Sequence, residues 1–136
     1  MIFTSYHPVY LLTSRPETKG YHRFHIGKTR EFAVLWYLYV RHFLGSNEHI
    51  TIVDQGGDIP ISDFLGYVEE PYDTGLANDA EVFDLANPVR LHIRAFLTKE
   101  GIREGVKRLY HYVYKTCYRN RLDMLFIEND CLVAKD

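Results

Sequence analysis

Lysine and arginine are absent from the middle of the chain, between Arg41 and Arg90. The same stretch, residues 42–89, carries ten acidic residues, whereas the two ends hold all 16 bases and only eight acids. The net charge of −2 therefore hides a basic, acidic, basic order along the 136 residues. An acidic block of this size attracts a cationic small molecule, a basic protein surface, or the chain's own basic ends.

Cysteine and long apolar runs are also scarce. The two cysteines, Cys117 and Cys131, form no CxxC pair, which indicates a reducing compartment and favours the cytoplasm. The longest apolar run, "FAVLWYLYV" (32–40), has nine residues and is too short to span a membrane. No signal peptide opens the sequence. We expect a cytoplasmic protein with no membrane partner, folded as one domain over residues 1–136.

Two segments have the apolar spacing of amphipathic helices. Residues 29–45 begin at Thr29, a suitable N-cap, and end before the helix-breaking Gly45. Residues 98–120 begin at Thr98 and carry a second apolar stripe. The sequence therefore predicts one helix near each end of the chain.

Strands are predicted between and around these helices. The candidate strands are 9–14, with the leading "MIFTS" as an open extension, 49–54, 63–70, 89–96 and 124–130, and "CLVA" (131–134) is a possible return strand. Residues 71–88, with Pro71, Gly75 and Pro88, are expected to form a loop. Strand 89–96 alternates: Leu91 and Ile93 face one way, and Arg90, His92 and Arg94 face the other.

This order of elements predicts an α+β fold of the ferredoxin-like or PII-like type, an α/β sandwich with both helices on one face of a mainly antiparallel sheet. The opposite face would then carry Arg90, His92 and Arg94 in a row. Water or a partner subunit would cover that face, which favours a homo-oligomer.

Familiar catalytic and ligand motifs are incomplete. The run "GKT" (27–29) ends like a phosphate-binding loop, but the first glycine of that motif should stand at position 22, which is His22. His22 and His25 lack a third nearby ligand, so we expect no metal and no cofactor. The bases of segment 98–120 resemble a solvated helix face, and with a net charge of −2 no nucleic-acid partner is expected.

The stretch "GYVEEPYD" (66–73) combines rings and carboxylates within the acidic block. Tyr67 and Tyr72 flank the adjacent Glu69 and Glu70. Aromatic rings beside a carboxylate suit a cationic or adenine-bearing ligand, although surface glutamates beside packing tyrosines would have the same pattern.

The opening "MIFTSYHPVYLLTSRP" resembles the start of the phage-encoded S-adenosylmethionine lyases, a family formerly described as hydrolases. A looser similarity runs through Asp54, Gly57 and the pair Glu69-Glu70. The resemblance implies a ferredoxin-like trimer with sites between subunits. It also implies cleavage of S-adenosylmethionine to methylthioadenosine and homoserine lactone, as a phage counter-defence against host restriction in the host cytoplasm.

In that reaction the substrate's own carboxylate displaces methylthioadenosine, so a site that orients the substrate and excludes water is sufficient. We assign Glu69 as the catalytic residue. The expected substrate-binding residues are Tyr67, Glu70, Thr13, Ser14 and Glu81, where Thr13 and Ser14 stand at a strand end. Glu81 and Asp84 are rivals to Glu69, because the glutamate of the family precedes the third strand.

Two other functions remain open on the sequence. The acidic block would suit a non-enzymatic phage inhibitor that binds a basic host protein. The predicted fold would also suit a PII-like sensor of a small ligand.

Overall fold

Five parallel strands form one sheet in the computed structural model, which describes residues 1–6, 30–45, 47–56 and 59–128. The strands are β1 (Ile2–Tyr6), β2 (Ile50–Asp54), β3 (Tyr72–Leu76), β4 (Leu91–Ala95) and β5 (Leu125–Phe126). Their order across the sheet is β3-β4-β2-β1-β5. Because every pair is parallel, all the carboxyl ends of the strands lie at one edge.

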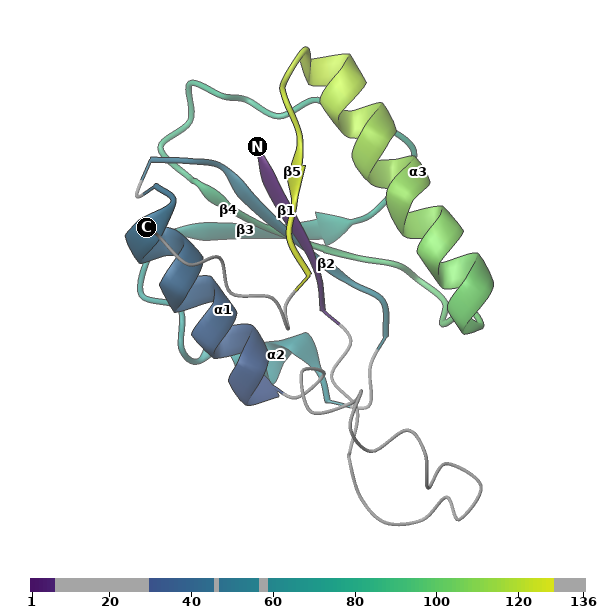
Figure 1. Cartoon of the computed structure of the whole chain (residues 1–136), viewed down its shortest axis with the longest axis horizontal. Helices are drawn as coiled ribbons and strands as arrows, with labels where there is room; N and C mark the ends of the chain where they lie inside the picture. Colours follow the sequence, from purple (N-terminus) through teal and green to yellow (C-terminus); the bar gives the residue numbers. More distant parts are fainter. Residues whose placement is uncertain (7–29, 46, 57–58, 129–136) are drawn as a thin grey trace.

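Helices cover both faces of this sheet (Figure 1). The helix α1 (Arg30–Phe43) and the short α2 (Ile61–Leu65) pack on one face through a core that includes Trp36, Ile52 and Phe64. The long α3 (Ile102–Asn120) packs on the other face with Phe3, Val53 and Val113. The result is a three-layer, doubly wound arrangement.

The central strands read as expected for a parallel sheet that is buried on both faces. β1 is buried at all five positions, and β2 and β4 are each buried at four of five. The ends of α1 match the helix dipole, with Glu31 in the first turn and Arg41 and His42 in the last. α3 ends at Arg121, whose left-handed backbone (φ 53°) caps the last carbonyls.

The prediction of a mainly antiparallel, ferredoxin-like or PII-like sandwich is wrong. Each connection along the chain is a crossover that returns the next strand in the same direction. The helices therefore lie on opposite faces and not on one face. Residues His92 and Arg94 face α3 and are buried (3% and 4% exposed), so the face that was predicted to meet water or a partner subunit is covered by the chain itself. The predicted trimer loses that support and stays a prediction.

Several elements also differ from expectation. Residues 63–70 do not form a strand, because α2 and a turn occupy this stretch, and the predicted loop 71–88 contains β3. α3 starts after Gly101 and not after Thr98. Helix 29–45 and strands 49–54, 89–96 and 124–130 are found at α1, β2, β4 and β5. Strand 9–14, strand 131–134, the cap Thr29, and the histidines 22 and 25 lie outside the described residues.

Among the described helices, none has both the length and the apolar character that a bilayer crossing requires.

Candidate functional site

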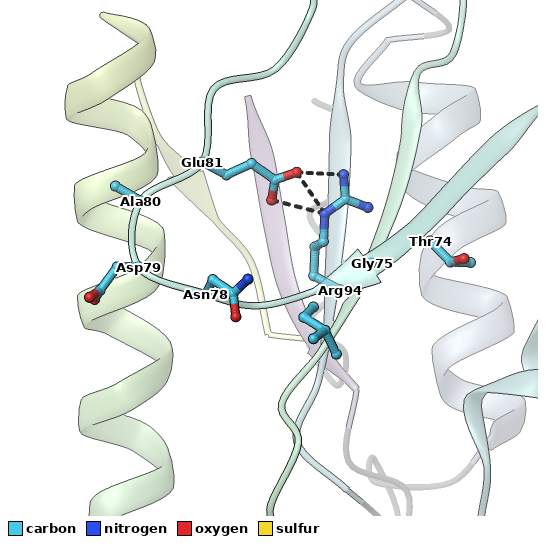
Figure 2. A pocket seen from close by; sticks show the side chains of 8 residues that line it. Thr74, Gly75, Asn78, Asp79, Ala80, Glu81 and Arg94 are labelled. Atoms are coloured by element: carbon cyan, nitrogen blue, oxygen red, sulfur yellow. Dashed lines mark hydrogen bonds and ion pairs between the residues drawn. The ribbon is translucent and has the colours of Figure 1, made fainter.

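Two acidic side chains, Asp73 and Glu81, converge on the buried guanidinium of Arg94, on the face of the sheet that α3 covers. Figure 2 shows the Glu81 half of this cluster. Asp73 comes from β3 and accepts hydrogen bonds from Arg94 Nη1 (2.9 Å) and Nη2 (3.3 Å). Glu81 comes from the segment between β3 and β4 and accepts from Arg94 Nη2 (2.7 Å) and Nε (2.9 Å). The buried positive charge of Arg94 is therefore balanced by two carboxylates.

This network uses all the donors of Arg94. The remaining Nη1 donor reaches the Ile93 carbonyl (3.0 Å), and Tyr112 of α3 donates to Glu81 Oε2 (2.8 Å). Burial disfavours the charged guanidinium, but Glu81 and Asp73 outweigh it and raise the pKa of Arg94. Burial and Glu81 together raise the pKa of Tyr112, so its hydroxyl stays a donor. The cluster therefore joins β3, β4, α3 and the segment around Glu81.

Two histidines extend the network toward the amino edge of the sheet. Arg90 Nη1 lies 2.7 Å from His49 Nε2, His49 Nδ1 lies 2.9 Å from His92 Nε2, and His92 Nδ1 lies 2.8 Å from Asp73 Oδ1. Because Arg90 can only donate, each imidazole must accept at Nε2 and donate at Nδ1. Both rings are therefore neutral, which agrees with their pKa values: burial lowers both, and His92 and Arg90 lower that of His49 further.

A shallow hollow of about 350 Å³ opens beside this network. It is lined by residues 74–76 of β3, by 78–81 and by Arg94, and Figure 2 shows Glu81 and Arg94 facing each other at one side. The guanidinium has no donor left for an anionic ligand, and Glu81 is held by three bonds to Arg94 and one to Tyr112. These contacts describe a structural ion network, in which Glu81 fastens its segment to the sheet.

The predicted site residue Glu70 is also bonded within the chain. Its Oε1 accepts from the Tyr37 hydroxyl (2.5 Å) and from Arg41 Nε (2.8 Å), and its Oε2 accepts from Arg41 Nη2 (3.1 Å). Glu70 therefore packs against α1, on the face of the sheet opposite to Glu81. The structure does not bring these two carboxylates together.

The other predicted residues are placed apart. Glu69 is exposed and makes no ion pair with another described residue. Tyr67 is half exposed and lies under Arg30, 5.8 Å from the guanidinium to the ring centre. Asp84 accepts from the backbone amide of Ala86 (3.1 Å), two residues on. Thr13 and Ser14 lie outside the described residues.

The adjacent glutamates offer a direct stability comparison. We expect Glu70→Gln to lower the free energy of unfolding by about 2 kcal/mol, because Arg41 and Tyr37 lose a charged partner in a half-buried setting. We expect Glu69→Gln to change it by less than about 0.5 kcal/mol. Urea unfolding of the two variants and the wild type measures both values, and equal losses would contradict the assigned contacts.

The carboxyl edge of the sheet holds a second group of polar side chains. Tyr6 ends β1 and Asp54 ends β2, and the two are paired in the parallel register. Asp54 Oδ1 accepts from the amide of Gly56 (2.8 Å), whose positive φ of 78° shapes the turn that follows. The Tyr6 hydroxyl donates to the Pro60 carbonyl (3.2 Å), and burial together with Asp54 raises the pKa of this phenol.

The sequence analysis named Asp54 only as part of a family resemblance and did not predict it as a ligand-binding residue. The available signal was an acid directly after the apolar run "ITIV" and before "QGG". That pattern marks the end of a buried strand followed by a glycine turn, which becomes informative once the strands are known to be parallel.

Within the part of the chain that the structure describes, no three His, Cys, Asp or Glu side chains are grouped so as to hold a metal ion. Comparison of the chain with family models, with curated proteins and with solved structures gives no match.

Proposed function

We propose that this protein binds a nucleoside-bearing small molecule at the carboxyl edge of the sheet, where β1 and β2 end. The observation that carries the proposal is the doubly wound parallel sheet with Asp54 as the last residue of β2, beside Tyr6. In open sheets of this type, ligands bind outside the carboxyl ends of the strands at the point where the strand order reverses. Here the connection after β2 leads to α2 on one face of the sheet and the connection after β4 leads to α3 on the other, so the reversal lies beside Asp54, between the neighbouring strands β2 and β4.

Asp54 has the chemistry for the sugar of such a ligand. A carboxylate that ends a strand next to β1 can accept hydrogen bonds from ribose hydroxyls, as acids in this position do in dinucleotide-binding sheets. Charge-assisted hydrogen bonds of this kind are stronger than neutral ones. The turn at Gly56 keeps the backbone close to the carboxylate, because the Gly56 amide donates to Asp54 Oδ1.

S-adenosylmethionine is the first ligand to test, because it carries an adenosine and because the opening of the chain resembles the lyases that cleave it. The resemblance implied a ferredoxin-like fold, which the parallel sheet contradicts. Cleavage of S-adenosylmethionine is therefore supported by the similarity of residues 1–16 alone. A cytoplasmic location belongs to this proposal, and the cysteine pattern of the sequence supports it.

The alternative of an acidic inhibitor has less support. Glu70, Asp73 and Glu81 of the acidic block are bonded to the chain's own Arg41 and Arg94. The charge of these three residues is therefore matched within the fold, although Glu69, Asp79 and Asp84 of the same block are exposed.

Calorimetric titration of the whole chain with a panel of nucleosides tests the proposal. The panel contains S-adenosylmethionine, S-adenosylhomocysteine, ATP, uridine diphosphate and a uridine diphosphate sugar, the last three with and without Mg²⁺. We expect at least one to bind, and Asp54→Asn to weaken that binding about tenfold or more, since a hydrogen bond to a charged group contributes about 1.5–3 kcal/mol. The asparagine keeps an oxygen for the Gly56 amide.

Asp123→Asn is the matched control, because Asp123 is exposed and lies before β5 at the opposite edge. It should bind like the wild type. Absence of binding to every member of the panel at millimolar concentration would contradict the proposal, as would equal affinities in Asp54→Asn and the wild type. Release of methylthioadenosine, followed in the same samples, tests cleavage, and Glu69→Gln tests the predicted catalytic residue.

A further inference from the structure

The outer face of α3 exposes aromatic rings that the core does not use. Tyr118 is 88% exposed and Tyr114 is 57% exposed, although tyrosine rings are commonly half buried or more. Tyr110, one turn before Tyr114, is stacked on it with ring centres 6.0 Å apart and is held from below by Phe126 at 5.2 Å. The three rings follow each other at spacings of four residues, so they form a ladder along one side of the helix.

Cations share this face. Between Arg103 and Arg121 the sequence holds six bases and one acid, within a chain whose net charge is −2. Two of these bases are paired with acids of neighbouring segments, Arg108 with Glu100 and Lys115 with Asp79. Lys107 and Arg103 are exposed and stand three and seven residues before Tyr110, which places them on the same side of α3. Arg121, the exposed residue that caps α3, follows Tyr118 by three residues. The single acid, Glu104, is bonded to Lys107 (3.0 Å).

We propose that this face of α3, the tyrosine ladder Tyr110–Tyr114–Tyr118 with its flanking bases, binds single-stranded nucleic acid. Rings four residues apart are separated by about 6 Å along the helix axis, a spacing on which successive unpaired bases can stack. The bases beside the rings then meet the phosphates. This inference is independent of the ligand proposed for the carboxyl edge.

Other partners fit the face less well. A helix that lies in a membrane surface needs large aliphatic or tryptophan side chains to insert. The exposed apolar side chains in line with the ladder are Tyr114 and Tyr118, with Val106 as an aliphatic neighbour one turn before Tyr110. A second copy of the chain would bring another strongly basic helix against the first and repel it. An acidic protein would satisfy the charges but would leave the flat rings without a matching surface.

Fluorescence anisotropy with a labelled oligothymidylate of about 20 nucleotides tests the proposal. We expect binding in the range of about 1–100 μM at low salt, with a matching double-stranded competitor less effective. The double variant Tyr114→Ala/Tyr118→Ala should bind at least tenfold more weakly, since each stacked base contributes about 1–3 kcal/mol. Both side chains are exposed, so the fold should survive, and thermal unfolding checks this.

Two further variants separate rings from charge. Lys107→Gln/Arg121→Gln should flatten the dependence of the logarithm of the affinity on the logarithm of salt concentration by about 1.4. Tyr72→Ala, a comparable exposed tyrosine on β3, should bind like the wild type. No binding up to about 100 μM protein, full binding by the tyrosine double variant, or binding to vesicles of anionic lipid without binding to the oligonucleotide would each overturn the proposal.

Discussion

Replacing Arg94 with methionine is expected to lower the free energy of unfolding by about 3 kcal/mol. The change removes the one cation that separates Asp73 from Glu81, and it leaves two carboxylates and the Tyr112 hydroxyl without their central partner. For a chain of this length the loss corresponds to a fall in melting temperature of roughly 10 °C. This loss of stability is smaller than for a fully buried pair, because the Asp73 side chain is 46% exposed.

Arg103→Met is the matched control, since Arg103 is exposed and has no ion pair with another described residue. It should change the free energy of unfolding by less than about 0.5 kcal/mol. Urea unfolding of both variants at neutral pH measures the difference. An Arg94→Met variant within about 1 kcal/mol of the wild type would contradict the account of Arg94 as the centre of the packing between β4, the segment around Glu81 and α3.

Acidification is expected to destabilise the protein as the pH falls below about 6.5, the ordinary pKa of histidine. His49 and His92 have lowered pKa values in the folded state, so the unfolded chain takes up protons first and the folded state loses stability as the pH falls toward the folded values. Each histidine contributes a slope of up to about 1.4 kcal/mol per pH unit. Asp73 affects stability in a lower pH range. Because its pKa is lowered in the folded state, its contribution to the free energy of unfolding is lost as the pH falls below about 3.8.

The physical cause is the direction of the hydrogen bonds. A proton on His49 Nε2 would face the Arg90 guanidinium, and one on His92 Nε2 would face the His49 N–H. The positive charge of the amino terminus also disfavours protonation of His49, and that of Arg94 disfavours protonation of His92. The negative charges of Glu48, Asp73 and Glu81 partly offset this lowering of the two pKa values.

Urea unfolding at pH 7.5 and pH 5.5 tests this prediction. The double variant His49→Gln/His92→Asn should lose most of the difference between the two pH values, whatever its stability at pH 7.5. His111→Gln is the control, because His111 is half exposed on α3, and it should behave like the wild type. A double variant with the full pH dependence of the wild type would show that other groups are responsible.

The sequence was sufficient for the elements with strong local signals. α1, α3 and the buried strands β2 and β4 have the spacing or the apolar runs that identify them. Even so, the spacing of the large apolar residues does not identify the inner face of α1, because Leu35 and Phe43 are about half exposed, whereas Ala33 and Val40 are buried. Large apolar side chains at helical spacing predict that a helix forms, but they do not predict equally well which side of the helix faces the core.

The elements with weak signals were missed. β3 is an edge strand with exposed residues and a glycine at position 75, so it lacks the alternation that marks a half-buried strand. The five-residue α2 buries only Phe64, and a helix this short has no periodicity to read. Both occur where tertiary contacts decide the backbone and local preference does not.

The parallel direction of the strands was not predicted, because the polar residues of β4 were interpreted as an exposed face. His92 and Arg94 alternate with apolar residues, and a polar face normally meets water. In this fold their partners, Asp73 and Glu81, are 19 and 13 residues earlier, and sequence alone does not show that they meet. Without these ion pairs β4 looked half exposed, which favoured an antiparallel sheet and placed the candidate site near Glu69 instead of at the strand ends.

Hydrogen–deuterium exchange with and without a bound nucleoside tests most directly that the ligand site is at the carboxyl edge of the sheet. The probe is the member of the panel that binds most tightly in calorimetry. We predict that it slows exchange at residues 54–56, where β2 ends, and at residues 96–99, which follow β4, and that Asp54→Asn reduces this protection. Protection confined to residues 66–73, around Glu69 and at the amino end of β3, would contradict the account.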